Sequence, residues 1–377
     1  MTQTVPVWID DPTNAAILAI SEDRLQGFQL DPFGAIAERS GVDVATVLER
    51  VVAMLRSGTI RRVRQTLMAT NLAAGALCAW QVPPERLDAA FDWLFREDPF
   101  SGHVVIRTTD AAVPGANYRL WTTLKVPQGF SLEKHAAFLA RTIGAEAYRL
   151  MPAKALFALG VGHVRRRGIE PGARADVPAE MKDTAIVELD ALEWRVLAAL
   201  KRELTVAEIV RGVWAPRARE AGVSLAEFGR VATALSAKGV IGRFSTFLEH
   251  VKPSAEAGGR SVTRYNALFH WKVPAGRELD AGRELGRHYI MTHAYWREGG
   301  PEFRGVNIMG VAHGTEKETV LAHKAAIDEH LREAGIAFDY TNVFWGGRSE
   351  IKPSEIAPAA YVEFCAAHHL EPETMRS

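Results

Sequence analysis

Two histidines in the later part of the sequence lie in short segments that suggest a reaction centre. His293 is found in THAYWR and His313 in GVAHG. Each segment predicts a β-strand, and the two strands are expected to be neighbours in one sheet. Two histidines on one face of a sheet can bind a metal ion or act as general acid and base. A histidine in a strand can also be purely structural, and the pattern alone leaves both interpretations open.

Basic and aromatic residues gather around the same predicted strands. Arginine suits carboxylates because its planar guanidinium group donates two parallel hydrogen bonds. The pattern therefore predicts a pocket for a flat molecule with several carboxylates. The alternative is a set of exposed charges on a sheet, each paired with a local Asp or Glu. The candidate binding residues are Arg62, Arg119, Lys125, Arg243, Tyr295, Arg297 and Lys352.

The elements that must position these residues are encoded twice. The stretch SGTIRRVRQTL at 57–67 has a near copy, KGVIGRFSTFL, at 238–248, and AWQVP at 79–83 matches HWKVP at 270–274. In each copy two helical patterns with a glycine between them precede a β-α-β-β-α-β order. We therefore predict an α+β fold, a tandem duplication of a winged helix-turn-helix head followed by a ferredoxin-like βαββαβ half.

The predicted boundaries follow from this repeat. The first unit covers residues 1–165 and the second covers 189–353, with a linker rich in Gly, Pro and charge at 166–188. The tail at 354–377 is expected to form a short helix with frayed ends. The copies differ at the histidines, because the first has His103 and Lys125 where the second has His293 and His313. This asymmetry predicts one working site, in the second copy, and one supporting site.

Composition narrows the class of protein. A chain of 377 residues exceeds one ordinary core, and its 47% hydrophobic and 24% charged residues are typical of a globular protein. The formal net charge of zero gives no overall attraction to nucleic acid or to an anionic membrane. The two cysteines form no CxxC pair, and no signal peptide or long apolar stretch is evident. We expect a cytoplasmic protein without a membrane segment.

A helix-turn-helix head raises the question of DNA binding. A reading helix needs Arg, Lys, Asn or Gln on its exposed face. The candidate reading helices, VDVATVLERVVAMLRS and SLAEFGRVATALSAKG, offer few such residues. The heads are therefore expected to brace the fold or pair subunits. No Walker loop, GxSxG or HExxH motif is present to support a nucleotide, hydrolase or metalloprotease function.

The order of these motifs resembles the siroheme decarboxylases, relatives of the Lrp/AsnC regulators. It runs from the helix-turn-helix through G-x-I-x-R, W-x-V-P and T-H-x-Y to a strand that ends in H-G. The resemblance covers about residues 20–170 and 188–352 and so matches a fused, two-copy form. By position, His293 and His313 match the histidines of that family. Arg62 and Arg243 match its strand arginine, and Lys352 matches a basic residue near the end of the repeat. The departures are Gly242 before Arg243, Ala294 after the first histidine, and Lys125 in place of the second histidine of copy one.

The resemblance implies a carboxy-lyase that removes CO2 from the acetate side chains of siroheme in heme or heme d1 biosynthesis. It implies no separate cofactor, since the iron tetrapyrrole is itself the substrate. One of His293 and His313 would be the axial ligand of the substrate iron and the other the proton donor. The alternatives are an Lrp/AsnC-type DNA-binding regulator, a tetrapyrrole-binding protein without catalysis, and an enzyme for another heme-like substrate. The two copies are expected to pair within one chain, and a homodimer is the alternative arrangement.

Overall fold

The computed structural model describes residues 5–68, 71–159, 168–182, 185–248 and 264–377. The chain divides into two compact units. Unit 1 takes in residues 1–68, 160–168 and 187–264, and unit 2 takes in residues 69–159, 169–186 and 265–377. Each unit therefore combines segments from both predicted copies. The duplication itself remains a prediction from the sequence.

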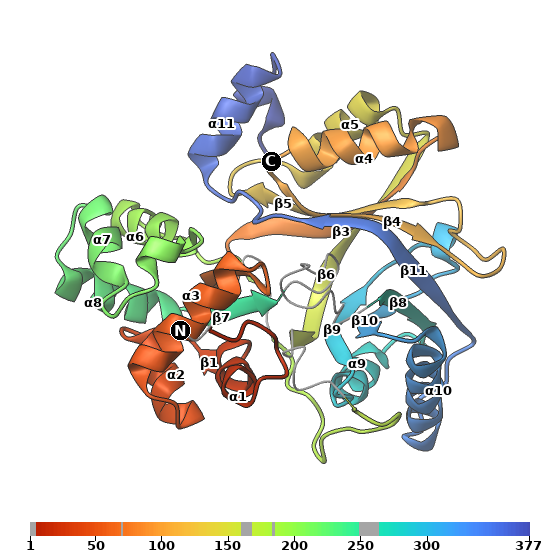
Figure 1. Ribbon diagram of the computed structural model, residues 1–377. Coiled ribbons are helices and arrows are strands. Elements are labelled where there is room, and N and C mark those ends of the chain that lie inside the picture. The colour runs from red at the N-terminus through yellow and green to blue at the C-terminus, as the bar shows by residue number, and fades with distance from the viewer. Residues whose placement is uncertain (1–4, 69–70, 160–167, 183–184, 249–263) are drawn as a thin grey trace. The chain divides into compact units, whose positions relative to one another are not determined.

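Unit 1 contains two helical segments that each lead into a strand (Figure 1). The first comprises α1 (Pro12–Ser21), β1 (Leu25–Gln26), α2 (Pro32–Ser40), α3 (Val44–Arg56) and β2 (Ile60–Leu67). The second comprises α6 (Ala191–Lys201), the 3-10 helix η4 (Val206–Glu208), α7 (Trp214–Glu220), α8 (Leu225–Ala237) and β7 (Ile241–Leu248). Strands β1, β7 and β2 form one antiparallel sheet in that order. The two segments therefore share a sheet.

Local sequence sets the ends of these helices. Asp31 caps α2 and Asp43 caps α3, each accepting a hydrogen bond from a backbone N–H of the first turn. Gly41 ends α2 at φ +72°, in the left-handed region that glycine adopts without strain. Helix α6 ends at Lys201. The chain becomes extended there, and the N–H of Leu204 donates to the carbonyl of Val63 on β2.

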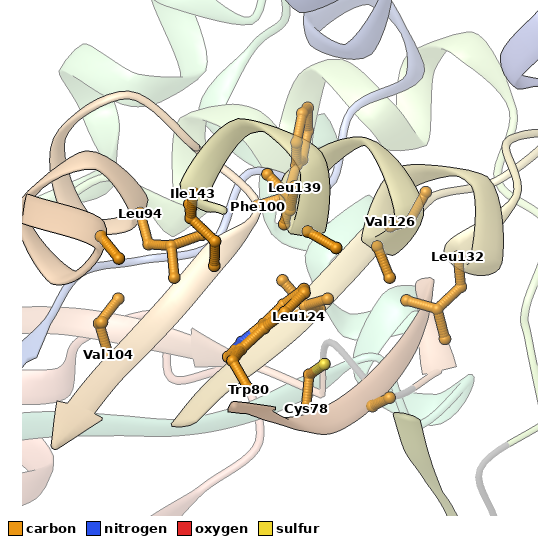
Figure 2. Close-up of a cluster of buried hydrophobic side chains, with 14 of the residues drawn as sticks. Cys78, Trp80, Leu94, Phe100, Val104, Leu124, Val126, Leu132, Leu139 and Ile143 are labelled. Atoms are coloured by element: carbon orange, nitrogen blue, oxygen red, sulfur yellow. The ribbon is translucent and has the colours of Figure 1, made fainter. Parts of the chain in front are cut away.

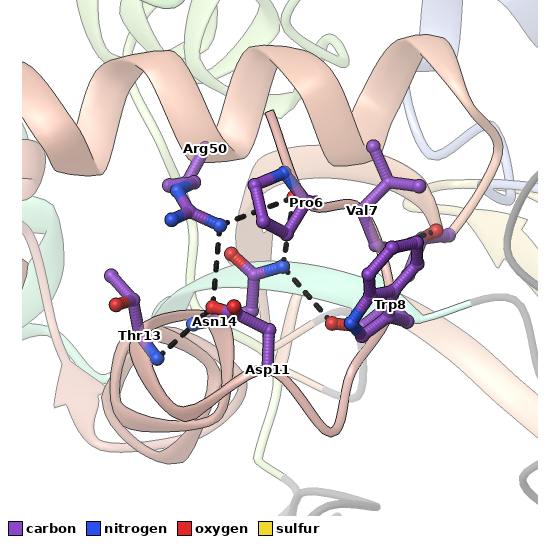
Figure 3. Close-up of polar contacts among 8 residues, drawn as sticks. Pro6, Val7, Trp8, Asp11, Thr13, Asn14 and Arg50 are labelled. Carbon is purple, nitrogen blue, oxygen red and sulfur yellow. Dashed lines mark hydrogen bonds and ion pairs between the residues drawn. The ribbon is translucent and has the colours of Figure 1, made fainter. Parts of the chain in front are cut away.

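The described part of the N-terminal segment is fastened to helices α1 and α3 (Figure 3). Asn14 donates from Nδ2 to the carbonyls of Pro6 and Trp8, both at 3.0 Å. Arg50 on α3 pairs with Asp11 at 3.2 Å, and Asp11 also caps α1. These contacts order a segment that sequence periodicity does not predict.

Unit 2 contains two halves with the same order of elements (Figure 1). The first half comprises β3 (Ala73–Gln81), η2 (Pro84–Arg86), α4 (Leu87–Arg96), β4 (Ser101–Thr108), β5 (Leu120–Pro127), α5 (Leu132–Ile143) and β6 (Ala147–Leu159). The second half comprises β8 (Tyr265–Lys272), α9 (Glu278–Gly286), β9 (Met291–Arg297), η5 (Pro301–Phe303), β10 (Ile308–Gly314), α10 (Lys317–Glu333) and β11 (Tyr340–Ile351). The sequence predicted this order of helices and strands.

The eight strands of unit 2 close into one barrel in the order β10-β8-β11-β4-β5-β3-β6-β9. Two ladders join the halves, one between β4 and β11 and one between β6 and β9. Side chains along each strand alternate between the inner and the helix-covered face. The sequence predicted the strands but not the closed barrel, since alternation does not specify the partner of an edge strand.

The outer face of the first half is covered by α4 and α5, as Figure 2 shows. Trp80, Leu124 and Leu139 belong to this buried cluster. The outer face of the second half packs against α9 and α10 through a second cluster that includes Phe269, Trp271 and Ile327. A third cluster, with Trp121, Met151, Leu268, Met309 and Phe344, fills the inside of the barrel.

The C-terminal tail is part of this structure. Helix α11 (Pro358–Ala367) and the 3-10 helix η6 (Pro372–Met375) follow β11. Tyr361 and Cys365 are fully buried in the cluster of the first half. Tyr361 also contacts His135 of α5 through a 3.1 Å hydrogen bond. The tail contains the expected short helix, and three apolar side chains of α11 reach the core.

Residues 169–186 of the predicted linker belong to unit 2. Arg174 forms an isolated bridge with His288, and Lys182 forms one with Leu156. In the described part of the chain, no helix is long and apolar enough to cross a membrane.

Candidate active site

His293 and His313 lie on neighbouring strands and on the same inner face of the barrel. On β10 the inner positions are those of Met309 and Val311, which belong to the inner cluster, and His313 continues this alternation. On β9, Ala294 faces the outer cluster, which places His293 on the inner face. His293 pairs with Val311 across the ladder. The two predicted histidines therefore share one surface.

A β-bulge lies immediately before His293. The register between β9 and β10 pairs Met291 with Ala312 and His293 with Val311, so that Thr292 is extra. The hydroxyl of Thr292 donates to the carbonyl of Val311 at 2.9 Å and lies 3.1 Å from Nδ1 of His293. Bulges re-aim side chains and are frequent next to active sites. The histidine ring is thus oriented by a local irregularity.

The first half repeats this geometry with different residues. Ser101 pairs with Leu124 and His103 with Thr123, so that Gly102 is the extra residue of an equivalent bulge. His103 therefore stands where His293 stands in the second half. Lys125 lies two positions beyond Thr123, as His313 lies two positions beyond Val311. Lys125 thus occupies the register position of His313.

A row of aromatic and cationic groups extends from His293 along β9. The rings of His293 and Tyr295 stack at 5.8 Å and 10°. The guanidinium of Arg297 lies 4.3 Å from the centre of the Tyr295 ring. Burial raises the pKa of Tyr295 and lowers the pKa of Arg297. Tyr295 and Arg297 were both predicted as binding residues, and the structure places them beside His293.

Two arginines reach across the ladders that join the halves. Arg297 donates to the carbonyl of Met151 on β6. Arg107 on β4 donates to the carbonyl of Phe344 on β11 at 3.3 Å and contacts Oδ1 of Asn266 at 3.4 Å. Burial lowers the pKa of Arg107 to about 9. Neither arginine has an ion pair with a carboxylate in the described part of the chain.

Lys125 lines a pocket of about 490 Å³. The other lining residues come from β3, β6, the start of α5, the linker and the C-terminus, and they are Ala73, Ala74, Gly75, Phe130, Ser131, Leu132, Glu133, Pro152, Ala153, Ile186 and Ser377. Burial, with a smaller contribution from the charge of Arg297, lowers the pKa of Lys125 to about 7. A group with such a pKa can donate or accept a proton at neutral pH.

The remaining predicted residues lie elsewhere. Arg62 and Arg243 belong to unit 1, where Arg62 pairs with Glu203 at 3.1 Å and Nε of Arg243 donates to the carbonyl of Glu22 at 3.0 Å. Arg119 precedes β5, and its carbonyl accepts from the N–H of Arg107. Lys352 follows β11, and its ammonium group contacts the carbonyl and the ring of Phe95 near the end of α4. Lys352 is therefore engaged with a helix of the outer layer.

Sequence reasoning missed His270. It is fully buried on β8, with its ring 4.9 Å from that of Phe344 and 6.1 Å from that of Trp121. Burial lowers its pKa to about 3. A signal was available, because HWKVP has a histidine where the matching AWQVP has Ala79.

In the described part of the chain no cluster of three or more His, Cys, Asp or Glu residues could hold a metal ion.

The chain is similar to known proteins over most of its length. Residues 72–158 match the family model of the AsnC-like ligand binding domain. The siroheme decarboxylase NirDL subunit of Paracoccus pantotrophus is 26% identical over 280 residues, covering 72% of this chain and 78% of that protein. The NirDL subunit of Paracoccus denitrificans (strain Pd 1222) is 25% identical over 315 residues, covering 81% and 89%. The chain resembles siroheme decarboxylases over most of its length. The resemblance predicted from the motifs is confirmed.

Solved structures show the same fold. The crystal structure of the siroheme decarboxylase NirDL matches with a TM-score of 0.65 at 18% identity, covering 95% of this chain and all of that chain. A crystal structure of NirDL in complex with an iron-uroporphyrin III analogue matches with a TM-score of 0.64 at 18% identity, covering 94% and 99%. The mixed α/β architecture of the siroheme decarboxylase is therefore present across both units.

Proposed function

We propose that this chain is a siroheme decarboxylase, a carboxy-lyase that removes CO2 from the acetate side chains of siroheme. The observation that carries the proposal is the similarity to siroheme decarboxylases across nearly the whole chain. The inner-face position of His293 and His313 supports it, because the reaction needs an iron ligand and a proton donor within reach of one substrate.

The chemistry assigns roles to the residues of β9 and β10. Loss of CO2 leaves an electron pair on the methylene carbon, and the conjugated macrocycle of the substrate can delocalise it. A proton must then reach that carbon to form a methyl group. One of His293 and His313 binds the substrate iron, and the other supplies the proton. Tyr295 offers a flat surface beside His293, and Arg297 offers positive charge beside Tyr295.

Substrate binding draws on further cations. Siroheme carries eight carboxylates, so its recognition needs many Arg and Lys donors. Within unit 2 the proposed binding residues are Arg119, Lys125 and Lys352, and within unit 1 they are Arg62 and Arg243. In unit 1, Arg64 and Arg243 lie 5.3 and 6.0 Å from the centre of the Phe247 ring, and burial lowers the pKa of both arginines. This group of cations beside an aromatic ring supports a role in binding a flat anion.

The finer architecture belongs to the same proposal. We assign each half of unit 2 to the ferredoxin-like class, supported by the strand orders β6-β3-β5-β4 and β11-β8-β10-β9. The helices of unit 1 that lead into β2 and β7 support winged helix-turn-helix heads. The β4–β11 and β6–β9 ladders support pairing of the two copies within one chain rather than a homodimer. A cytoplasmic location remains a prediction from composition.

The test is a visible-absorption titration of the purified, anaerobic protein with siroheme, followed by mass spectrometry of the extracted pigment. We expect a shifted Soret band and loss of the mass of CO2. His293→Ala and His313→Ala are expected to lower the rate by at least about 100-fold while the fold is retained. His369→Asn, at an exposed position with φ +54°, serves as the matched control because asparagine tolerates that backbone.

The outcomes separate the rival functions. A shifted band with unchanged pigment would indicate a tetrapyrrole-binding protein or an enzyme for another heme-like substrate. No spectral change, together with salt-sensitive binding to a defined DNA site, would indicate a regulator of the Lrp/AsnC type. Full activity of the double histidine variant would show that the proposed chemistry is wrong.

A further inference from the structure

The two halves of unit 2 have the same register around their inner faces, which allows position-by-position comparison. Lys125 pairs with Gly75 on β3, and His313 pairs with Asn266 on β8. Both pairs join the third strand of a half to its first strand. Each pair lies beyond an equivalent bulge, which precedes His103 in the first half and His293 in the second half. Lys125 is thus the structural counterpart of His313, and His103 of His293.

The first half is built around the lysine side chain. A Cβ atom at Gly75 would lie 2.7 Å from Nζ and 2.8 Å from Cδ of Lys125. A side chain at this position would therefore require the Lys125 side chain to move, and glycine leaves it in place. The same pocket that Lys125 lines is bordered by Gly75, so the amine has open space beside it. The geometry is that of an inward-facing amine with access for a ligand.

The charges around Lys125 leave its amine available. Arg297 of β9 is the charged group whose field reaches it. Glu133 at the start of α5 is the acidic side chain of the pocket, and the C-terminal residue Ser377 also lines it. Residues 73–75 of β3 and 152–153 of β6 contribute no titratable side chain to the lining. Within the described residues, Nζ of Lys125 has no hydrogen-bond acceptor and no ion-pair partner. Its lowered pKa, with burial as the main cause, agrees with a group that exchanges protons at neutral pH.

We propose that Lys125 is the proton donor of a second decarboxylation site, in the first half of unit 2, where it takes the place of His313. This inference rests on the proposed function and deepens it: siroheme loses two acetate carboxylates, and the two halves would each protonate one product carbon. The bond between the methylene carbon and the carboxylate breaks, CO2 leaves, and the electron pair stays on the carbon. The ammonium group of Lys125 transfers a proton to that carbon, a C–H bond forms, and the neutral amine regains a proton from water in the pocket.

The experiment follows the pigment by mass spectrometry during anaerobic turnover of siroheme. Lys125→Met is expected to slow the second loss of CO2 by about 100-fold or more and to accumulate singly decarboxylated pigment. Lys125→His is expected to restore the second step to within about tenfold and to change its pH profile. Lys134→Met is the control, since Lys134 is exposed on α5 and bonds to the carbonyl of Arg376.

The failures are distinguishable. If the wild type converts siroheme and Lys125→Met gives doubly decarboxylated pigment at the wild-type rate, or slows both steps equally, the inference is wrong and the function stands. If the wild type leaves siroheme unchanged, the function and the inference fall together. The rate of acetylation of Lys125 by acetic anhydride, measured against pH by peptide mass spectrometry, tests the amine without siroheme. An amine that titrates near pH 10 would overturn the inference.

Discussion

Replacement of Lys125 by methionine should raise the stability of the protein at neutral pH. Burial, with a smaller contribution from Arg297, lowers the pKa of Lys125 from 10.5 to about 7. At about 1.4 kcal/mol per pKa unit, this shift corresponds to at most about 5 kcal/mol. The pocket admits water beside the amine, so we expect the real cost to be about 1–3 kcal/mol. The cost is present when the amine is charged in the folded state.

The pH dependence of this stability difference follows from proton binding at Lys125. Between pH 7 and 10.5 the unfolded chain binds more protons at Lys125 than the folded chain, so the stability of the wild type rises with pH over this range. Lys125→Met lacks this dependence. Its advantage in free energy of unfolding should therefore be largest at pH 6–7 and shrink towards pH 10. Urea unfolding at several pH values measures it, with Lys134→Met as the control. Parallel stability curves for Lys125→Met and the wild type would refute the argument.

Two further variants test the packing of unit 2. Asp98 is fully buried, and although burial alone would raise its pKa, His135 and the hydrogen bonds that Asp98 accepts lower it. Asp98→Asn should therefore lower the free energy of unfolding by about 3 kcal/mol at pH 7, measured by urea unfolding, and the variant should lose less stability than the wild type as the pH falls. An equal loss of stability in both proteins at low pH would contradict this. Gly282→Ala on α9 should lower the melting temperature, because its Cβ would collide with the Phe157 ring. The control is Gly229→Ala on α8 of unit 1, which meets only ordinary contacts and should be neutral or stabilising by up to about 1 kcal/mol. Equal melting temperatures of the two variants would contradict the packing.

Hydrophobic periodicity predicted most elements of both units but missed two helices. Helix α1, PTNAAILAIS, is apolar on several faces, so no helical stripe marks it. Helix α7 contains a proline and two arginines and shows no apolar stripe either. It buries Arg217, which pairs with Glu208 at 2.9 Å. From the sequence alone an arginine is expected to be exposed, because the partner that allows its burial is known only from the fold.

In the candidate site, too, the sequence predicted some features and missed others. The sequence predicted that His293 and His313 lie on neighbouring strands, and the register of the β9–β10 ladder places both on the inner face. The approach of Arg297 to Lys125 was not predicted, because it depends on closure of the barrel through the β6–β9 ladder. His270 was missed for a related reason. Its burial depends on aromatic residues from β5 and β11, which only the folded barrel brings around it.

Two differences between the halves lie at paired positions, and we predict that they are energetically coupled. In the second half, Asn266 contacts Arg107 and pairs with His313. In the first half, Gly75 pairs with Lys125, whose pKa the charge of Arg297 helps to lower. Gly75→Asn alone should destabilise unit 2, because its Cβ would lie 2.7 Å from Nζ and 2.8 Å from Cδ of Lys125, so that the lysine side chain must move. Lys125→His removes the contacts with Nζ and Cδ and leaves the one with the carbonyl of Leu124 at 3.0 Å, so the double variant should be more stable than the sum of the single effects by about 1–2 kcal/mol. Additive effects in urea unfolding would show that Gly75 and Lys125 vary independently, and glycine would then need another explanation.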